Sequence, residues 1–219
     1  MSLRLFLDSA DGAQWREWLP GGLLFGVTTN PSLLQRAGVA CSLPALSALT
    51  EQALSLGAQE IHLQAWGGTA AAFYECGTAL AAIAPTQVAV KLPITRAGTE
   101  AAARLLAEGT RVTFTACYDV SQMLIASALG ADYAAPYLGR IGDAGRDGHA
   151  EVIAMQRAIE GLGATTRVLV ASVRETRDLS RLAAAGLHTF TLSPALLAAL
   201  FEQPETLAAA RQFELDAGA

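Results

Sequence analysis

The chain has 219 residues, 52% hydrophobic and 16% charged, with a formal net charge of −5, and this length suits one large core because single α/β barrels commonly reach about 200–250 residues. No apolar run approaches the ~18–20 residues of a membrane span, the opening Met1–Asp8 is too briefly apolar for a signal peptide, and no basic stripe favours nucleic acid. We therefore expect a cytoplasmic protein with one domain, residues 1–219, and neither membrane nor nucleic acid as a partner.

Short β-type runs alternate with Ala- and Leu-rich helical segments along the whole chain. The predicted strands are Leu3–Asp8, Leu23–Thr28, Glu60–Gln64, Gln87–Lys91, Arg111–Thr115, Tyr133–Pro136, Arg167–Ala171 and His188–Leu192. The predicted helical segments are 12–19, 43–56, 69–84, 97–107, 119–129, 149–162, 174–185 and 194–214. Strict β/α alternation implies a parallel sheet, and eight repeats predict a single (β/α)8 TIM barrel of the α/β class. A doubly wound open sheet is the alternative.

The C-terminal ends of the predicted strands are polar, although the strand bodies behind them are mostly apolar. In a (β/α)8 barrel the chemistry takes place at these ends, which together form the mouth of the barrel. The polar side chains there are Asp8, Thr28, Thr29, Asn30, Gln64, Lys91, Thr115, Tyr137, Arg140, Ser172, Arg174, Thr191 and Ser193. Polar groups that converge around one amine and one carboxylate indicate an active site.

Lys91 is the only lysine of the chain, since the other fourteen of its fifteen basic residues are arginines. It ends an apolar strand, where burial disfavours the ammonium form and lowers the pKa. A neutral amine is a nucleophile that forms a Schiff base with a carbonyl substrate, which a guanidinium cannot do. The alternative is a structural lysine whose stem packs on the core while its head reaches water.

Groups around this amine suit imine chemistry on a ketone or aldehyde. Asp8 is placed to take the proton of the hydroxyl whose C–C bond breaks, and Tyr137 to assist dehydration and hydrolysis as an acid. Arg140 and Arg174 follow consecutive strands, where this fold commonly holds a phosphate, and with Ser172 they form a candidate clamp. Surface salt bridges are the alternative role for both arginines.

His62 precedes Gln64 by two residues, so the strand period points it into the barrel below the mouth. A hydrogen-bonded core histidine is favoured over a proton relay.

The histidines and cysteines show no metal-ligand spacing: His62, His149, His188, Cys41, Cys76 and Cys117. We therefore expect no metal and no cofactor, a zinc-dependent aldolase is disfavoured, and the unpaired cysteines fit a reducing compartment.

Two segments carry a resemblance to a known family. Gly26–Leu34, Gly-Val-Thr-Thr-Asn-Pro-Ser-Leu-Leu, resembles the first signature of the transaldolase family, and Val88–Thr95, Val-Ala-Val-Lys-Leu-Pro-Ile-Thr, resembles the second, which carries the Schiff-base lysine. Thr99 departs from the apolar residue that the second signature leads us to expect. Further matches, from the first strand to the last, are Leu5–Asp8, Ala135–Ile141 and Val170–Arg174.

The resemblance implies a class I aldolase type of barrel in which Lys91 forms the imine and Asp8 handles the proton of C–C cleavage. It implies that Asn30 and Thr115 hold substrate hydroxyls or the catalytic water. The residues implied to bind the substrate phosphate are Arg140, Ser172 and Arg174.

Two positions separate the branches of this family. Transaldolases have Glu where this chain has Gln64 and Phe where it has Tyr137, whereas fructose-6-phosphate aldolases resemble this chain at both. The resemblance therefore favours a metal-free aldolase that makes and cleaves fructose 6-phosphate from dihydroxyacetone and glyceraldehyde 3-phosphate. The alternative is a transaldolase of the pentose phosphate pathway, because Arg140 and Arg174 are shared with that branch. A barrel that binds sugar phosphates without catalysis would not need the amine.

The last predicted helix, Pro204–Leu215, presents a partly apolar surface that includes Leu207, Ala210, Arg211 and Phe213–Leu215. Such a surface packs either on its own barrel or on a neighbouring subunit. The family resemblance implies a homo-oligomer, either a ring or a dimer, with small-molecule sugar phosphates and dihydroxyacetone as the other partners.

Overall fold

The computed structural model describes residues 2–218 and contains eight strands that are all parallel. The strands are β1 (Arg4–Asp8), β2 (Gly26–Thr28), β3 (Glu60–Gln64), β4 (Val88–Pro93), β5 (Val112–Cys117), β6 (Tyr133–Pro136), β7 (Arg167–Val168) and β8 (Thr189–Leu192). Their order is β7-β6-β5-β4-β3-β2-β1-β8, so consecutive strands are neighbours and β8 returns to β1. The predicted (β/α)8 TIM barrel is confirmed.

The barrel closes between β7 and β8 through a short and irregular contact. The main-chain nitrogen of Val170 donates to the carbonyl of Thr189 at 2.9 Å, and that of Thr191 donates to the carbonyl of Val170 at 2.9 Å. We predicted a regular strand over Arg167–Ala171, but the regular ladder ends at Val168 and continues only as single bridges. Closure therefore depends on a few main-chain hydrogen bonds.

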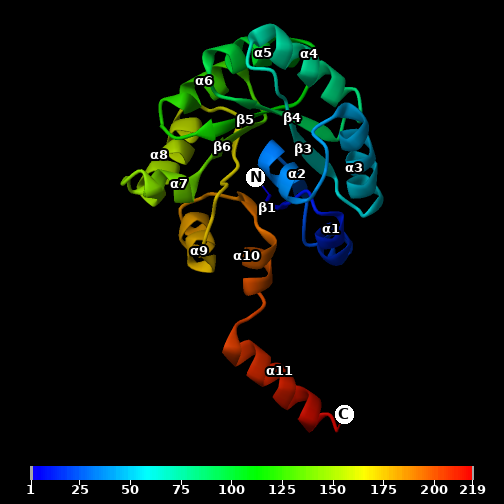
Figure 1. The fold of residues 1–219 in the computed structure, drawn as a ribbon. Coiled ribbons are helices and arrows are strands. Elements are labelled where there is room, and N and C mark those ends of the chain that lie inside the picture. The colour runs from blue at the N-terminus through cyan, green and yellow to red at the C-terminus, as the bar shows by residue number, and fades with distance from the viewer. Residues whose placement is uncertain (1, 219) are drawn as a thin grey trace.

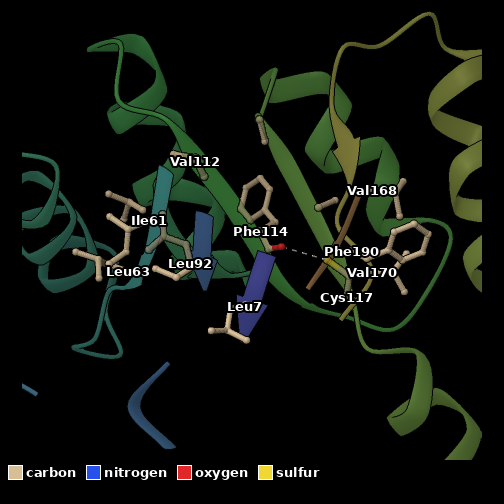
Figure 2. Packing of buried hydrophobic residues seen from close by; sticks show 14 of the residues in the cluster. Leu7, Ile61, Leu63, Leu92, Val112, Phe114, Cys117, Val168, Val170 and Phe190 are labelled. Carbon is tan, nitrogen blue, oxygen red and sulfur yellow. Dashed lines mark hydrogen bonds between the residues drawn. The ribbon is translucent and has the colours of Figure 1, made fainter. Parts of the chain in front are cut away.

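Helices between the strands lie outside the barrel, as Figure 1 shows for those that arch around the sheet. The long ones begin close to their predicted starts: α1 (Gly12–Trp18), α3 (Leu43–Ser55), α4 (Ala70–Ala81), α5 (Arg96–Ala107), α6 (Gln122–Leu129), α8 (Gly148–Gly161) and α9 (Thr176–Ala184), with a short 3-10 helix η1 (Leu19–Gly21). Their apolar faces pack on the strands in a core cluster that includes outward-pointing Leu7, Ile61 and Phe114 (Figure 2). This packing fixes the strand ends that carry the polar residues.

Two short helices that we did not predict follow strands directly at the mouth. Helix α2 (Pro31–Arg36) follows β2, and helix α7 (Leu138–Asp143) follows β6. The Asn30 side chain accepts a hydrogen bond from the main-chain nitrogen of Leu33, and Pro31 takes the first helical position, which are two standard signals of a helix start. These helices bring further side chains over the barrel interior.

The helical segment predicted over 194–214 is divided into two helices, and the second agrees with the predicted last helix, Pro204–Leu215. The chain forms α10 (Pro194–Ala199) and α11 (Pro204–Asp216), separated by Gln203, whose backbone is extended with ψ of 115°. A proline disfavours the helical conformation of the residue before it and cannot donate a main-chain hydrogen bond, so the helix is interrupted at Pro204. Helix α11 extends away from the barrel and buries none of its residues (Figure 1). None of the described helices is long and apolar enough to cross a membrane.

His62 lies inside the barrel, fully buried between the rings of Phe6 and Tyr133, each with its centroid 4.9 Å away. Its Nε2 is 2.6 Å from the Glu60 carboxylate, and its Nδ1 is 2.9 Å from the Thr113 hydroxyl. Burial lowers the pKa of His62. Both ring nitrogens are therefore partnered, as expected for a core histidine.

Candidate active site

The Lys91 side chain emerges from β4 into the barrel and is only 5% exposed. Its Nζ donates a hydrogen bond to the main-chain carbonyl of Thr29 at 2.8 Å. Burial lowers the pKa of Lys91, and the nearby Asp8 carboxylate opposes this effect without overcoming it. The surroundings of the amine thus favour its neutral, nucleophilic form.

Asp8 ends β1 and stands beside Thr28 of β2 in the strand register. The Thr28 hydroxyl donates to Oδ1 of Asp8 at 2.7 Å, and the Thr191 hydroxyl of β8 lies 2.5 Å from that of Thr28. The two threonines are 1% and 4% exposed, whereas Asp8 is half-buried. The carboxylate is consequently held by the Thr28 hydroxyl on one side and faces the cavity on the other.

Tyr137 stands at the start of α7, and its hydroxyl is 2.7 Å from the hydroxyl of Thr115 on β5. Burial raises the pKa of Tyr137, and its hydrogen bond with Thr115 and the charge of Arg140 reduce the rise. The Arg140 guanidinium carbon lies 5.0 Å from the centre of the tyrosine ring. A neutral phenol in this position is a proton donor to a bound substrate.

One cavity at the mouth collects most of the predicted site. Of the nine site residues that the sequence predicts, seven line it: Asp8, Asn30, Lys91, Thr115, Tyr137, Arg140 and Ser172. Gln64 is next to Lys91 in the strand register but is not among the lining residues, and its amide nitrogen is 3.5 Å from the carbonyl of Ala65. The residues come from six strands or the loops that follow them, so the barrel assembles the cavity.

Arg174, the ninth predicted residue, is exposed and does not line this cavity. Its guanidinium forms a two-pronged ion pair with the Asp143 carboxylate at the end of α7, and one of the two hydrogen bonds is 2.8 Å long. A Cβ atom at Gly139 would lie 2.6 Å from Arg174 Nε and 2.7 Å from the carbonyl oxygen of Ser172. Glycine therefore allows the arginine to pack over the start of α7, directly beside Ser172.

Ser172 has a left-handed backbone with φ of 58°, a conformation that costs a non-glycine residue roughly 1–2 kcal/mol. Strain of this kind persists where the surrounding structure imposes it, and it occurs often at ligand-binding positions. The Ser172 carbonyl accepts a hydrogen bond from the main-chain nitrogen of Gly139 at 3.0 Å. This contact fixes the turn that presents the serine to the cavity.

The cavity also contains residues that the sequence analysis missed: Ser32, Leu33 and Arg36 reach it from α2. Thr28 and Thr191, which the sequence placed at the mouth without a role, line it as well. The Asn-Pro pair before α2 was the available signal for the first three, since it marks a helix start at a strand end. Within residues 2–218 no group of three or more His, Cys, Asp or Glu side chains is placed to hold a metal ion.

This (β/α)8 barrel places a buried amine, a carboxylate, a phenol and the arginines Arg36 and Arg140 around one mouth. That is the organisation of an enzyme of this fold. Comparison with known proteins gives the particular family. The model of the Transaldolase/Fructose-6-phosphate aldolase family matches residues 5–218, and the chain belongs to this family.

Relatives of similar length include proteins named "Probable transaldolase" from three bacteria. The one from Rhodospirillum centenum is 35% identical over 98% of this chain and 90% of its own, and that from a Caulobacter species is 35% identical over 98% and 96%. The protein from Thermus thermophilus is 34% identical over 93% of each chain. These names agree with the transaldolase alternative better than with the aldolase that we expected first.

Proposed function

We propose that this protein is a Schiff-base transaldolase that moves a dihydroxyacetone unit from one sugar phosphate to another. The observation that carries the proposal is the single buried lysine amine, hydrogen-bonded to a neutral carbonyl and kept at a lowered pKa at the mouth of the barrel. The relatives named "Probable transaldolase" support transfer over simple cleavage.

The proposed reaction begins when neutral Lys91 Nζ attacks the C2 carbonyl of the ketose. The carbinolamine loses its hydroxyl as water with a proton from Tyr137, which leaves an iminium ion and a Tyr137 phenolate; the phenolate recovers a proton from the water that later adds to the product iminium. Asp8 then takes the proton of the C4 hydroxyl, the C3–C4 bond breaks, and its electron pair moves into the iminium to give an enamine. The aldehyde product, which carries the phosphate group, then leaves the site.

The enamine then attacks the carbonyl carbon of an acceptor aldose phosphate, and protonated Asp8 returns its proton to the new C4 alkoxide. Addition of water to the new iminium, with Asn30 and Thr115 as the proposed holders of that water, releases the product and restores the amine. Arg140, Ser172 and Arg174 are the proposed phosphate ligands. Arg174 has to exchange its contacts with Asp143 for phosphate oxygens, or share its guanidinium between them.

Cleavage of fructose 6-phosphate to free dihydroxyacetone is the second candidate function. It is favoured by the tyrosine hydroxyl that reaches Thr115 inside the cavity, because an acid near the enamine promotes its protonation and hydrolysis. Gln64, beside Lys91 in the strand register, is the second position at which the sequence resembles the aldolase branch. In both functions the chemistry at Lys91 and Asp8 is the same. The two differ in whether water or an aldehyde intercepts the three-carbon intermediate.

The proposal includes a cytoplasmic homo-oligomer that acts without a metal or cofactor. Phosphorylated sugars are charged metabolites that stay inside the cell, which supports the location. Leu207, Phe213 and Leu215 of α11 are 44%, 69% and 68% exposed, and an apolar surface of this kind supports burial against another copy of the chain.

A side-by-side assay with fructose 6-phosphate tests the proposed function. With erythrose 4-phosphate present, we expect rapid formation of sedoheptulose 7-phosphate and glyceraldehyde 3-phosphate; without an acceptor, we expect glyceraldehyde 3-phosphate to form much more slowly. Equal rates in the two arms, with free dihydroxyacetone in both, would favour the aldolase instead. A lack of turnover in either arm would remove both candidates.

A further inference from the structure

Two buried threonines form a hydrogen-bonded chain that ends on Asp8. Strand β1 lies between β2 and β8, and each of these neighbours contributes one threonine to the lower wall of the cavity. The Thr28 hydroxyl is 2.7 Å from Asp8 Oδ1, and the Thr191 hydroxyl is 2.5 Å from the Thr28 hydroxyl. The carboxylate is thus linked through side chains to both strands that flank its own.

The direction of these hydrogen bonds follows from the number of protons. An ionised carboxylate only accepts, so Thr28 gives its single hydroxyl proton to Asp8. The Thr28 oxygen then has only lone pairs to offer to Thr191, and Thr191 has to donate. The chain therefore runs from Thr191 through Thr28 to Asp8, with each donor polarised toward the carboxylate.

We propose that Thr28 and Thr191 are positioning residues for Asp8, which hold its carboxylate turned toward the substrate bound on Lys91. This inference rests on the proposed function, in which Asp8 takes the proton of the hydroxyl next to the breaking bond. A freely rotating carboxylate would meet that proton less often, because general-base catalysis needs hydrogen-bonding geometry with the group that loses the proton.

The hydrogen-bonded chain from Thr191 to Asp8 predicts which substitutions reduce activity most. Thr28→Val keeps the β-branched shape but leaves Asp8 Oδ1 without this donor and Thr191 without its acceptor. Thr191→Val keeps the donor to Asp8 and removes only the second link, so its effect is smaller. Thr28→Ser retains the hydroxyl. The matched control is Thr50→Val: Thr50 is equally buried, but its hydroxyl bonds to the carbonyl of Leu46 within α3.

Steady-state transfer from fructose 6-phosphate to erythrose 4-phosphate measures these effects. For Thr28→Val we expect kcat to fall by about tenfold or more, as for the loss of a hydrogen bond to a charged group, with KM changed by less than about threefold because the substrate itself loses no contact. Thr191→Val should lose less, Thr28→Ser should recover most of kcat, and Thr50→Val should behave like the wild type.

Borohydride reduction during turnover identifies the affected step. The wild type should carry a mixture of adducts on the Lys91 peptide, and in Thr28→Val the intact six-carbon adduct should increase relative to the three-carbon adduct, because cleavage is slowed and imine formation is not.

An unchanged adduct ratio, an unchanged kcat in Thr28→Val, or a Thr28→Ser variant as slow as Thr28→Val would overturn the positioning role. Absence of any adduct on Lys91 in the wild type would instead refute the proposed function, and this proposal with it. If Thr28→Val does not fold, Thr191→Val decides: a kcat equal to that of Thr50→Val overturns the chain.

Discussion

The Nζ atom of Lys91 and the main-chain oxygen of Thr29 are 2.8 Å apart, and this hydrogen bond orients the only amine side chain of the protein. Thr29 is itself fixed, because its main-chain nitrogen and its hydroxyl both donate to the carbonyl of His62, each at 3.0 Å. A neutral carbonyl positions the amine without stabilising the ammonium as strongly as a contacting carboxylate would. The main chain of two neighbouring strands therefore sets the place of the nucleophile, while burial lowers its pKa.

Replacement of Lys91 tests this role directly. Lys91→Arg and Lys91→Ala should both lose activity by about 10⁴-fold or more, as other enzymes do when their nucleophile is removed, because arginine restores the charge but not the nucleophilicity. Borohydride with fructose 6-phosphate or dihydroxyacetone should label the wild type once, on the peptide that contains Lys91. Label on another peptide, or full activity without label, would exclude the imine mechanism.

Tyr137→Phe separates transfer from hydrolysis. The ring is retained while its hydroxyl and the contact with Thr115 are lost, so release of free dihydroxyacetone should fall on the order of 10²-fold if this phenol is the acid. The bound three-carbon unit should then live longer, and formation of sedoheptulose 7-phosphate should fall less or even rise. Equal losses in both assays would confine Tyr137 to dehydration of the carbinolamine, which both reactions share, and would remove its role in hydrolysis. No change in either assay would reduce it to a packing residue.

Arg174→Ala tests the proposed phosphate clamp. Loss of a charge-assisted contact should raise KM for glyceraldehyde 3-phosphate by roughly ten- to hundredfold, while unphosphorylated glyceraldehyde is hardly affected. Arg177→Ala is a suitable control, since Arg177 is a neighbouring exposed arginine that pairs with Glu175. Equal losses for both aldehydes would mean that Arg174 supports α7 through Asp143 and does not bind the phosphate.

Glu60 should make folding stability depend on pH in acid. Burial alone would raise its pKa, but the hydrogen bond with His62 and the charge of Arg111 outweigh burial and hold the pKa at about 2, below its ordinary 4.5. Because this carboxyl binds its proton at a higher pH in the unfolded chain, the contribution of Glu60 to stability is complete above about pH 4.5 and is lost as the pH falls toward 2. His62, with its lowered pKa, contributes in the same direction below its ordinary 6.5.

This loss should amount to about 3 kcal/mol between neutral pH and pH 2, measurable as the free energy of unfolding in urea across that range. Glu60→Gln should flatten the acidic part of the curve, whereas Glu100→Gln, at an exposed helical ion pair, should leave it unchanged. The same slope in Glu60→Gln and the wild type would show that other carboxylates control acid stability.

Removal of α11 should change the oligomeric state. A chain that ends before Pro204 loses the exposed Leu207, Phe213 and Leu215 but no buried contact of the barrel, so it should fold and should elute as a smaller species than the full chain. Light scattering coupled to size-exclusion chromatography gives both masses. The full chain eluting as a monomer would contradict the proposed homo-oligomer.

The sequence by itself determined the repeating fold and the centre of the chemistry. Strand and helix periods are local properties, so eight alternating segments were enough to predict the barrel, and the polarity of the strand ends located the mouth. A lone lysine at the end of an apolar strand needed no tertiary information to stand out. The helix that starts at Pro31 also had a local signal, but the apolar pattern around it hid that signal.

Only the tertiary structure decided which polar groups meet. Several contacts of the site join residues from different strands or loops: the ion pair of Arg174 with Asp143, the hydrogen bond of Lys91 to Thr29, and the hydrogen bonds that link Thr191, Thr28 and Asp8. No periodicity along the sequence encodes such pairings. The reason is that a side chain's partner depends on strand register and loop path, which are set by the closure of the whole barrel. The sequence therefore indicated the residues that surround the substrate, while barrel closure determined how each one is held.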